Sequence, residues 1–235
     1  MISQKKAVLI HGCHLEAEGW ESIVWGSPSE GLWGSIPRGV QLAYNENVSL
    51  IFLGTGASEK EGVKESEYMF QFALSHLSEL ADLCQSKPEE LKVFLEERSF
   101  IDKVTQNTTE ELRAYFDMCL LKEITNPIIT AVATHASRSI KVGLAIVLKE
   151  EKYRIFRHKV IWAPADTCFE GASVDDVVVV EPPHRGDIPK WQTFRYAKTL
   201  FEIMGQGEDV FEKFLSEWGD LIRKYGVDVW WKPKK

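Results

Sequence analysis

The chain has 235 residues with 28 Lys or Arg and 35 Asp or Glu, which gives a formal net charge of −7. An acidic chain offers no basic stripe to a phosphate backbone, and no apolar run reaches the ~18 residues needed to cross a bilayer, so neither a nucleic-acid nor a membrane partner is expected. With 44% apolar and 27% charged residues, the composition is typical of one packed globular domain, or one domain with an appendage.

The cysteine and histidine patterns predict neither disulfides nor a metal site. The four cysteines are scattered without CxxC spacing, and the six histidines form no HxxxH or HExxH pattern. The N-terminus lacks the core of a signal peptide, so a reducing cytoplasmic location is expected. The sequence identifies no cofactor.

The first third of the chain alternates apolar runs with glycine-rich stretches. Residues 7–10 form an apolar run that ends at His11-Gly12-Cys13-His14 and predicts a strand buried on both faces. Residues 20–33 contain three tryptophans among Gly, Ser and Pro, and they predict a long ordered loop. A helix is expected at 35–45, with Pro37 in its first turn, and a second buried strand at 48–53.

The rest of the chain continues this alternation. Asn107 followed by Glu110 is the signature of a helix N-terminus. The other expected helices cover residues 63–83 and 87–97, a helix after residue 134, and 191–204 and 210–225; the other expected strands cover 128–133, 154–162 and 177–180. This order predicts a doubly wound α/β fold with a mostly parallel sheet, helices on both faces and a helical C-terminal extension. Residues 1–150 are expected to form the core, and residues 151–235 a part packed on the same domain.

In such sheets ligands bind beyond the carboxyl ends of the strands, so the polar residues after each strand are the candidate site. His11 to His14 predicts either a ligand contact or a turn with one buried histidine. The glycine-rich turn Gly54-Thr55-Gly56 predicts an anion-binding nest, although it lacks the full P-loop and GxGxxG patterns. Glu67 follows near the start of a helix, where the helix dipole alone explains a carboxylate. For Asn107 and Thr108, a ligand role would come in addition to capping.

The segment that contains His135 and Arg138 is the strongest candidate. The two residues lie three apart at a strand-to-helix junction, so an imidazole, a guanidinium and free backbone N–H groups meet there. This combination suits a phosphate or carboxylate group. A cation in the first turn opposes the helix dipole, so Arg138 needs a partner, either an anionic ligand or the carboxylate of Glu67 or Glu111.

The order of these motifs resembles the YdcF-like (SanA/ElyC-related) domain-of-unknown-function family over about residues 7–148. The residues that carry the resemblance are Gly12, Arg38, Gly54-Thr55-Gly56, Ser66-Glu67, Glu96-Glu97-Arg98-Ser99, Asn107-Thr108 with Glu111, and Thr134-His135-Ala136-Ser137-Arg138. The resemblance implies a Rossmann-like fold and one cleft lined by the polar motif residues. The chain departs from the family's pattern where His11 to His14 replaces a glycine run and where a Trp-rich loop precedes Arg38.

The residues and the resemblance together predict a soluble enzyme that hydrolyses or transfers a group of a small anionic metabolite. A phosphorylated or nucleotide-like substrate, with phosphoryl or glycosyl-phosphate chemistry, suits these side chains. His135 is the expected general acid or base, oriented by Glu67 or Glu111. The expected substrate-binding residues are Gly12, Arg38, Gly54, Thr55, Gly56, Asn107, Thr108 and Arg138.

Two other functions stay open at this point. One is a non-catalytic binding module for a nucleotide or an S-adenosylmethionine-like metabolite, in which the Trp-rich loop acts as a stacking lid. The other is an interaction protein that docks through Trp230-Trp231, and association with a second copy of the chain is equally open.

Overall fold

The computed structural model describes residues 5–27, 30–167, 179–181 and 190–192, together with residues 207, 209, 210 and 213. The chain divides into two compact units, Met1–Arg195 and Tyr196–Lys235. Most residues of the helices expected at 191–204 and 210–225 lie outside the described residues.

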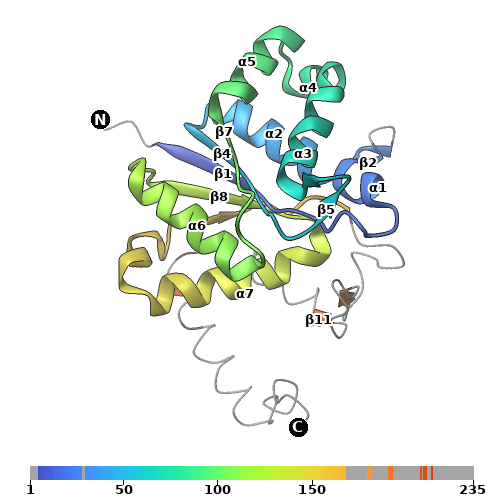
Figure 1. Cartoon of the computed structure of the whole chain (residues 1–235). Helices are drawn as coiled ribbons and strands as arrows, with labels where there is room; N and C mark the ends of the chain where they lie inside the picture. The colour runs from blue at the N-terminus through green and yellow to red at the C-terminus, as the bar shows by residue number, and fades with distance from the viewer. Residues whose placement is uncertain are drawn as a thin grey trace. The chain divides into compact units, whose positions relative to one another are not determined.

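A five-stranded parallel sheet forms the centre of the first unit (Figure 1). Its strands, in spatial order, are β7 (Ser99–Ile101), β4 (Leu50–Leu53), β1 (Lys6–Ile10), β8 (Asn126–Thr130) and β9 (Ile161–Trp162). All five run parallel, with Ile10 beside Leu53 on one side and beside Thr130 on the other. The apolar runs at residues 7–10 and 48–53, which predicted buried strands, correspond to β1 and β4.

Helices cover both faces of the sheet. Figure 1 shows α2 to α5 on one face and α6 with α7 on the other. Their bounds are α2 Ser35–Asn45, α3 Glu65–Ser75, α4 Leu77–Cys84, α5 Pro88–Arg98, α6 Thr108–Leu121 and α7 Ala133–Lys149. The predicted Rossmann-like α/β fold is therefore confirmed.

The core is close-packed where the helices meet the strands. Gly39 of α2 lies so near Ile10 that an added Cβ would come 2.5 Å from the Ile10 side chain. On the other face the Tyr115 hydroxyl donates to the carbonyl of Ala7 at 3.0 Å and accepts from the N–H of Ile128 at 3.1 Å. One buried phenol thus satisfies backbone groups of two adjacent strands.

The helix expected at 63–83 is interrupted at His76. The Ser75 hydroxyl donates to the Phe72 carbonyl at 2.8 Å, and His76 Nδ1 lies 2.9 Å from the same oxygen. These side-chain contacts compete with the backbone ladder, so α3 ends and α4 begins there. Residues 63 and 64 belong instead to β6 (Val63–Lys64), which forms an antiparallel hairpin with β5 (Glu59–Lys60).

Two other sequence predictions were wrong in part. The Trp-rich loop contains a helix, α1 (Trp20–Trp25), and a hairpin of β2 (Gly26–Ser27) with β3 (Leu32–Trp33). The strand expected at 154–162 is confined to β9, because a 3-10 helix, η2 (Glu151–Phe156), precedes it. Tyr153 and Phe156 are three residues apart and both pack on Phe116, which a strand could not achieve.

The described part of the C-terminal region contains one more strand pair. The strand expected at 177–180 is described from residue 179 onward, as β10 (Val179–Glu181). It pairs antiparallel with β11 (Lys190–Gln192), so residues 191 and 192 are extended rather than the start of a helix.

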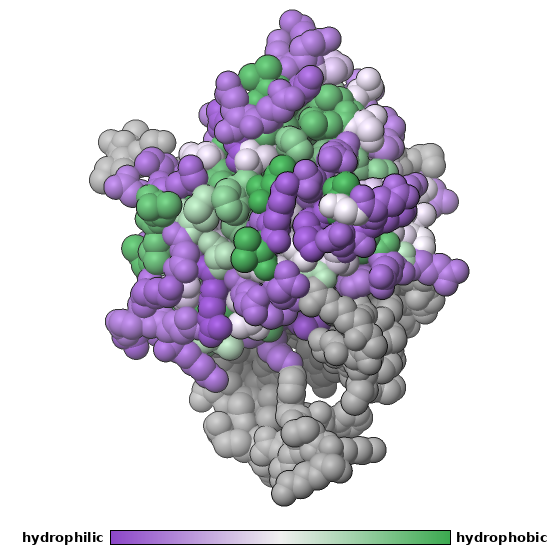
Figure 2. Space-filling model, in the orientation of Figure 1, coloured by the Kyte–Doolittle hydropathy of each residue, from purple (hydrophilic) through white to green (hydrophobic). Residues whose placement is uncertain are grey.

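Apolar side chains reach the surface near the β7 edge of the sheet. Phe100 of β7 is 40% exposed, and its ring packs against the buried ring of Phe52. Figure 2 shows apolar residues near the middle of the face that it draws, between hydrophilic residues. Self-association of the chain stays a prediction.

The cap of α6 provides a test of the local sequence signal. Asn107 Oδ1 accepts hydrogen bonds from the N–H groups of Thr109 at 3.1 Å and Glu110 at 3.0 Å, which confirms the predicted N-cap. Replacing Asn107 with Ala is expected to lower the free energy of unfolding by about 1 kcal/mol, because two helix N–H groups lose their acceptor. Urea denaturation measures the change. Asn45→Ala, at the exposed end of α2, is the control and should change it by less than about 0.5 kcal/mol.

Candidate functional site at the carboxyl edge of the sheet

The order of the strands reverses between β1 and β8. Strands β4 and β7 follow one another on one side of β1, whereas β8 and β9 lie on its other side. Ligands of doubly wound sheets bind beyond the carboxyl ends of the strands at such a reversal. Here the N–H of His11 donates to the carbonyl of Thr130 over 3.0 Å, directly beyond β1 and β8.

His11 is the centre of a buried chain of polar side chains. Its Nδ1 lies 2.7 Å from Glu111 Oε2, and its Nε2 lies 2.5 Å from Ser139 Oγ. The side chains of His11 and Glu111 are only 1% and 2% exposed. Because an ionised carboxylate only accepts hydrogen bonds, Nδ1 donates to Glu111. This series of hydrogen-bonded side chains joins the end of β1 to α6 and α7.

Local sequence explains why Glu111 can be buried here. Asn107 begins α6, which places Glu111 within its first turns, where the positive end of the helix dipole stabilises a carboxylate. Transferring a carboxylate from water to the protein interior costs several kcal/mol, and the hydrogen bond from His11 offsets part of that cost. Glu111 and His11 are therefore a coupled pair.

His135 completes the cluster from α7. Its ring stacks on the His11 ring, with centroids 5.0 Å apart and planes inclined by 27°. Its Nε2 lies 3.3 Å from the hydroxyl oxygen of Thr108. The structure thus brings together three of the expected site residues, Thr108, Glu111 and His135. Glu111 bonds to His11, and His11 in turn stacks on His135.

Two glycines make room for buried carboxylates. A Cβ on Gly54 would overlap the Glu111 carboxylate, and a Cβ on Gly12 would overlap the carboxylate of Glu65. Within the described residues, Glu111 Oε1 is buried and has no hydrogen-bond partner. The strand-end glycines are therefore required by the acidic side chains packed against them.

Glu65 is a site residue that the sequence analysis missed. It is 3% exposed at the start of α3, and its Oε2 accepts a hydrogen bond from Ser58 Oγ at 2.5 Å. Ser58 Oγ in turn accepts from the N–H of Leu15 at 3.0 Å. Glu67 is 30% exposed and pairs with Lys103 at 2.8 Å. The motif Glu-Ser-Glu alone does not reveal which carboxylate turns inward.

The turn that follows β4 uses its N–H groups inside the protein. Gly54 donates to Ile10, Gly56 donates to Thr105, and Ala57 donates to the Thr55 hydroxyl. The peptide bond between Gly54 and Thr55 is cis. These three N–H groups already have protein acceptors, so they do not form the expected anion nest. A substrate contact by this turn stays a prediction.

The side chain of Asn107 is engaged as well. Besides capping α6 through Oδ1, it donates from Nδ2 to Glu110 Oε1 at 2.7 Å. Capping was expected to leave the Asn107 NH₂ group available to a ligand, but this group donates to Glu110 instead.

Of the two arginines expected to hold an anion, Arg38 lies in the first turn of α2, whereas Arg138 lies in the second turn of α7 rather than in the expected first turn, because α7 begins at Ala133. Arg38 is half-buried; its Nη1 donates to Gln41 at 3.4 Å, and its Nε is buried without a hydrogen-bond partner among the described residues. Arg138 is half-buried one turn beyond His135. Convergence of both guanidinium groups on one ligand stays a prediction.

The described cysteines away from the site are unsuited to nucleophilic chemistry. Burial raises the pKa of the Cys84 thiol to about 11 and that of the Cys119 thiol to about 12. Both therefore stay protonated near neutral pH. Cys168 lies outside the described residues.

Comparison with known proteins gives no match: no protein family model, no curated protein and no solved structure matches the chain. Among the described residues, no three His, Cys, Asp or Glu side chains gather in a way that could hold a metal ion. The helices in the described part of the chain include none of the length and apolarity needed to cross a membrane.

The pairing of Glu111 with His11 is tested by Glu111→Gln. The substitution removes the charge and places an NH₂ group where Glu111 Oε1 lies without a partner, so we expect the free energy of unfolding to fall by about 1–3 kcal/mol. Urea denaturation measures it. Glu97→Gln, on the exposed surface of α5, serves as the control. Equal small effects from both substitutions would contradict a coupled buried pair.

The need for glycine at position 54 is tested by a double-mutant cycle. Gly54→Ala is expected to cost about 1–3 kcal/mol, because the new methyl group overlaps the Glu111 carboxylate. In a background carrying Glu111→Ala the overlap is gone, so the cost of Gly54→Ala should fall markedly.

Gly31→Ala is the control for this cycle. Gly31 has a φ of 73° in open space, so this substitution introduces backbone strain without an overlap. Its cost should be the same in both backgrounds. Equal costs of Gly54→Ala in both backgrounds would refute the proposed overlap.

Proposed function

We propose that the carboxyl edge between β1 and β8 binds a small anionic metabolite, phosphorylated or nucleotide-like, and that the chain hydrolyses or transfers its phosphoryl or glycosyl-phosphate group. The observation that carries this proposal is the contact of His135 with both His11 and Thr108 at the reversal of strand order. The half-buried imidazole of His135 stacks on the buried pair of His11 and Glu111, and an imidazole supported in this way suits proton transfer.

In this proposal each residue has a distinct task. His135 exchanges a proton with the substrate, because its ring is half-buried whereas that of His11 is almost fully enclosed. Arg138, one turn further along α7, balances the charge of the anion, and Arg38 assists from the start of α2. Glu111 acts through His11 as a positioning residue. These roles keep the general acid or base and the two arginines that the sequence predicts, with His11 added; the YdcF-like resemblance implies only that these residues line one cleft.

A cytoplasmic location is part of the same proposal. Cys84 and Cys119 support it, because both are buried thiols rather than members of a disulfide.

Binding and turnover are measured on the full chain. Thermal-shift screening with sugar phosphates, nucleotides and S-adenosylmethionine identifies a ligand, and ³¹P NMR then follows its conversion. Arg138→Ala should weaken binding by about 10- to 100-fold, the loss expected when a charge-assisted hydrogen bond is removed. His135→Ala should abolish turnover and leave binding within about threefold.

Arg113→Ala is the matched control, because Arg113 is an arginine of α6 that pairs with Glu150 on the surface. It should leave both binding and turnover unchanged. Binding that depends on Arg138 but yields no product would overturn the catalytic part and support a binding module. Loss of stability with binding retained in Arg138→Ala would show that this arginine is structural.

A further inference from the structure

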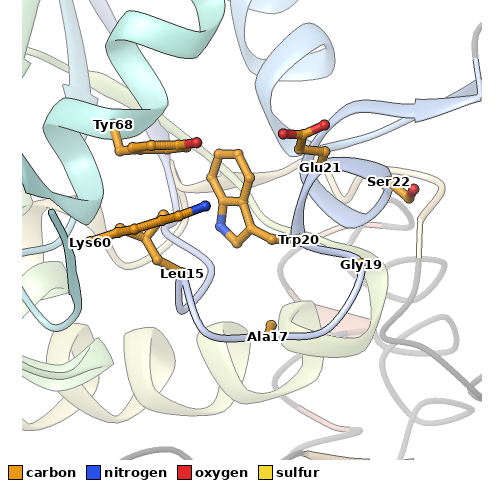
Figure 3. Close-up of a pocket in the computed structure, with 8 residues that line it drawn as sticks. All are labelled: Leu15, Ala17, Gly19, Trp20, Glu21, Ser22, Lys60 and Tyr68. Carbon is orange, nitrogen blue, oxygen red and sulfur yellow. The ribbon is translucent and has the colours of Figure 1, made fainter.

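An open hollow of about 350 Å³ lies beside the loop that follows β1 (Figure 3). This loop, α1, the β5–β6 hairpin and α3 form its walls. The side chains used in the argument below are Leu15, Trp20, Glu21, Ser22, Lys60 and Tyr68. The volume is in the range of small-molecule sites, which start at about 300 Å³.

Two aromatic rings form a fixed corner of this hollow. Trp20 meets Tyr68 edge to face, with ring centroids 5.2 Å apart and planes at 81°. The Trp20 indole N–H donates to the carbonyl of Cys13 at 2.8 Å, so this ring is anchored by the backbone of the loop. Tyr68 is half-buried, and Figure 3 shows its ring along the upper edge of the hollow.

Charged groups with no ion pair among the described residues also line the hollow. The Lys60 ammonium lies 5.5 Å from the centre of the Tyr68 ring. Glu21 and Ser22 lie in the first turn of α1, where both are exposed and neither side chain forms a hydrogen bond within the described residues. The hollow therefore offers a donor, an acceptor and an aromatic face.

The hollow is joined to the candidate site through the backbone. The Leu15 N–H bonds to Ser58, which donates to the buried carboxylate of Glu65. Leu15 is four positions after His11, so their α-carbons are at most about 14 Å apart. One wall of the hollow and the histidine cluster therefore belong to the same short loop.

We propose that the hollow binds the base of a nucleotide-like ligand, while its phosphate lies at the histidine cluster; this inference rests on the function proposed above. A nucleobase combines a π-face with N–H donors and N or O acceptors along its edges. Tyr68 supplies the aromatic contact, Lys60 a donor and Glu21 an acceptor. An aliphatic ligand would leave the two charged groups without partners.

Separate probes for the two halves of the ligand test this inference. Isothermal titration of the full chain uses guanosine and adenosine for the hollow, and pyrophosphate for the histidine cluster. Tyr68→Leu should weaken nucleoside binding by about 5- to 100-fold, the loss expected from one stacking contact, and should leave pyrophosphate binding unchanged. Tyr68→Phe should retain nucleoside binding because it keeps the ring.

Two further variants separate binding from folding. Lys60→Ala changes an exposed side chain and should weaken nucleoside binding without lowering the melting temperature. Tyr44→Leu is the matched control for Tyr68→Leu, because Tyr44 of α2 packs on Phe94 and does not line the hollow. It should leave nucleoside binding unchanged.

The outcomes distinguish this inference from the proposed function. Pyrophosphate binding that depends on Arg138, without nucleoside binding that depends on Tyr68, overturns the inference and leaves the proposed function standing. The opposite result supports a nucleoside site and overturns the proposed function. Binding of neither probe overturns both.

Discussion

The hydrogen-bonded chain of Glu111, His11 and Ser139 is the interaction on which the site depends. It joins the end of β1 to α6 and α7 with distances of 2.7 and 2.5 Å in an almost fully enclosed place. Each member satisfies a polar neighbour that water cannot reach, so removing one leaves another uncompensated. The stacked ring of His135 is held against this chain, and its orientation follows from the position of His11.

The glycines at the strand ends serve this arrangement by leaving space. Gly54 leaves room for the carboxylate of Glu111, and Gly12 leaves room for that of Glu65. From the sequence, Gly54 and Gly56 predict an anion nest. A nest and close packing against another side chain both require glycine, so the sequence pattern cannot separate the two. The two readings differ in where the N–H groups point, and the donors of Gly54 and Gly56 point to protein carbonyls.

The sequence predicts those elements whose signals lie within a few residues. It does not predict the orientation of a side chain that depends on residues far away in the chain. Strand β1 and the capped start of α6 follow from an apolar run and one asparagine. The inward turn of Glu65 rather than Glu67 depends on Ser58 and Lys103, and no pattern within α3 separates the two carboxylates. The contact of His11 with Ser139 spans 128 positions of the chain, so only the fold brings the two together.

A small anion bound as proposed would lie near the buried carboxylates of Glu111 and Glu65, and both would repel it. The positive ends of α6 and α7 would oppose that repulsion. His11 Nδ1 lies 2.7 Å from the carboxylate of Glu111, so the side chain that stabilises this buried carboxylate is also the one on which the ring of His135 stacks. The arrangement that would bind the anion and the arrangement that keeps Glu111 buried therefore share one side chain, His11.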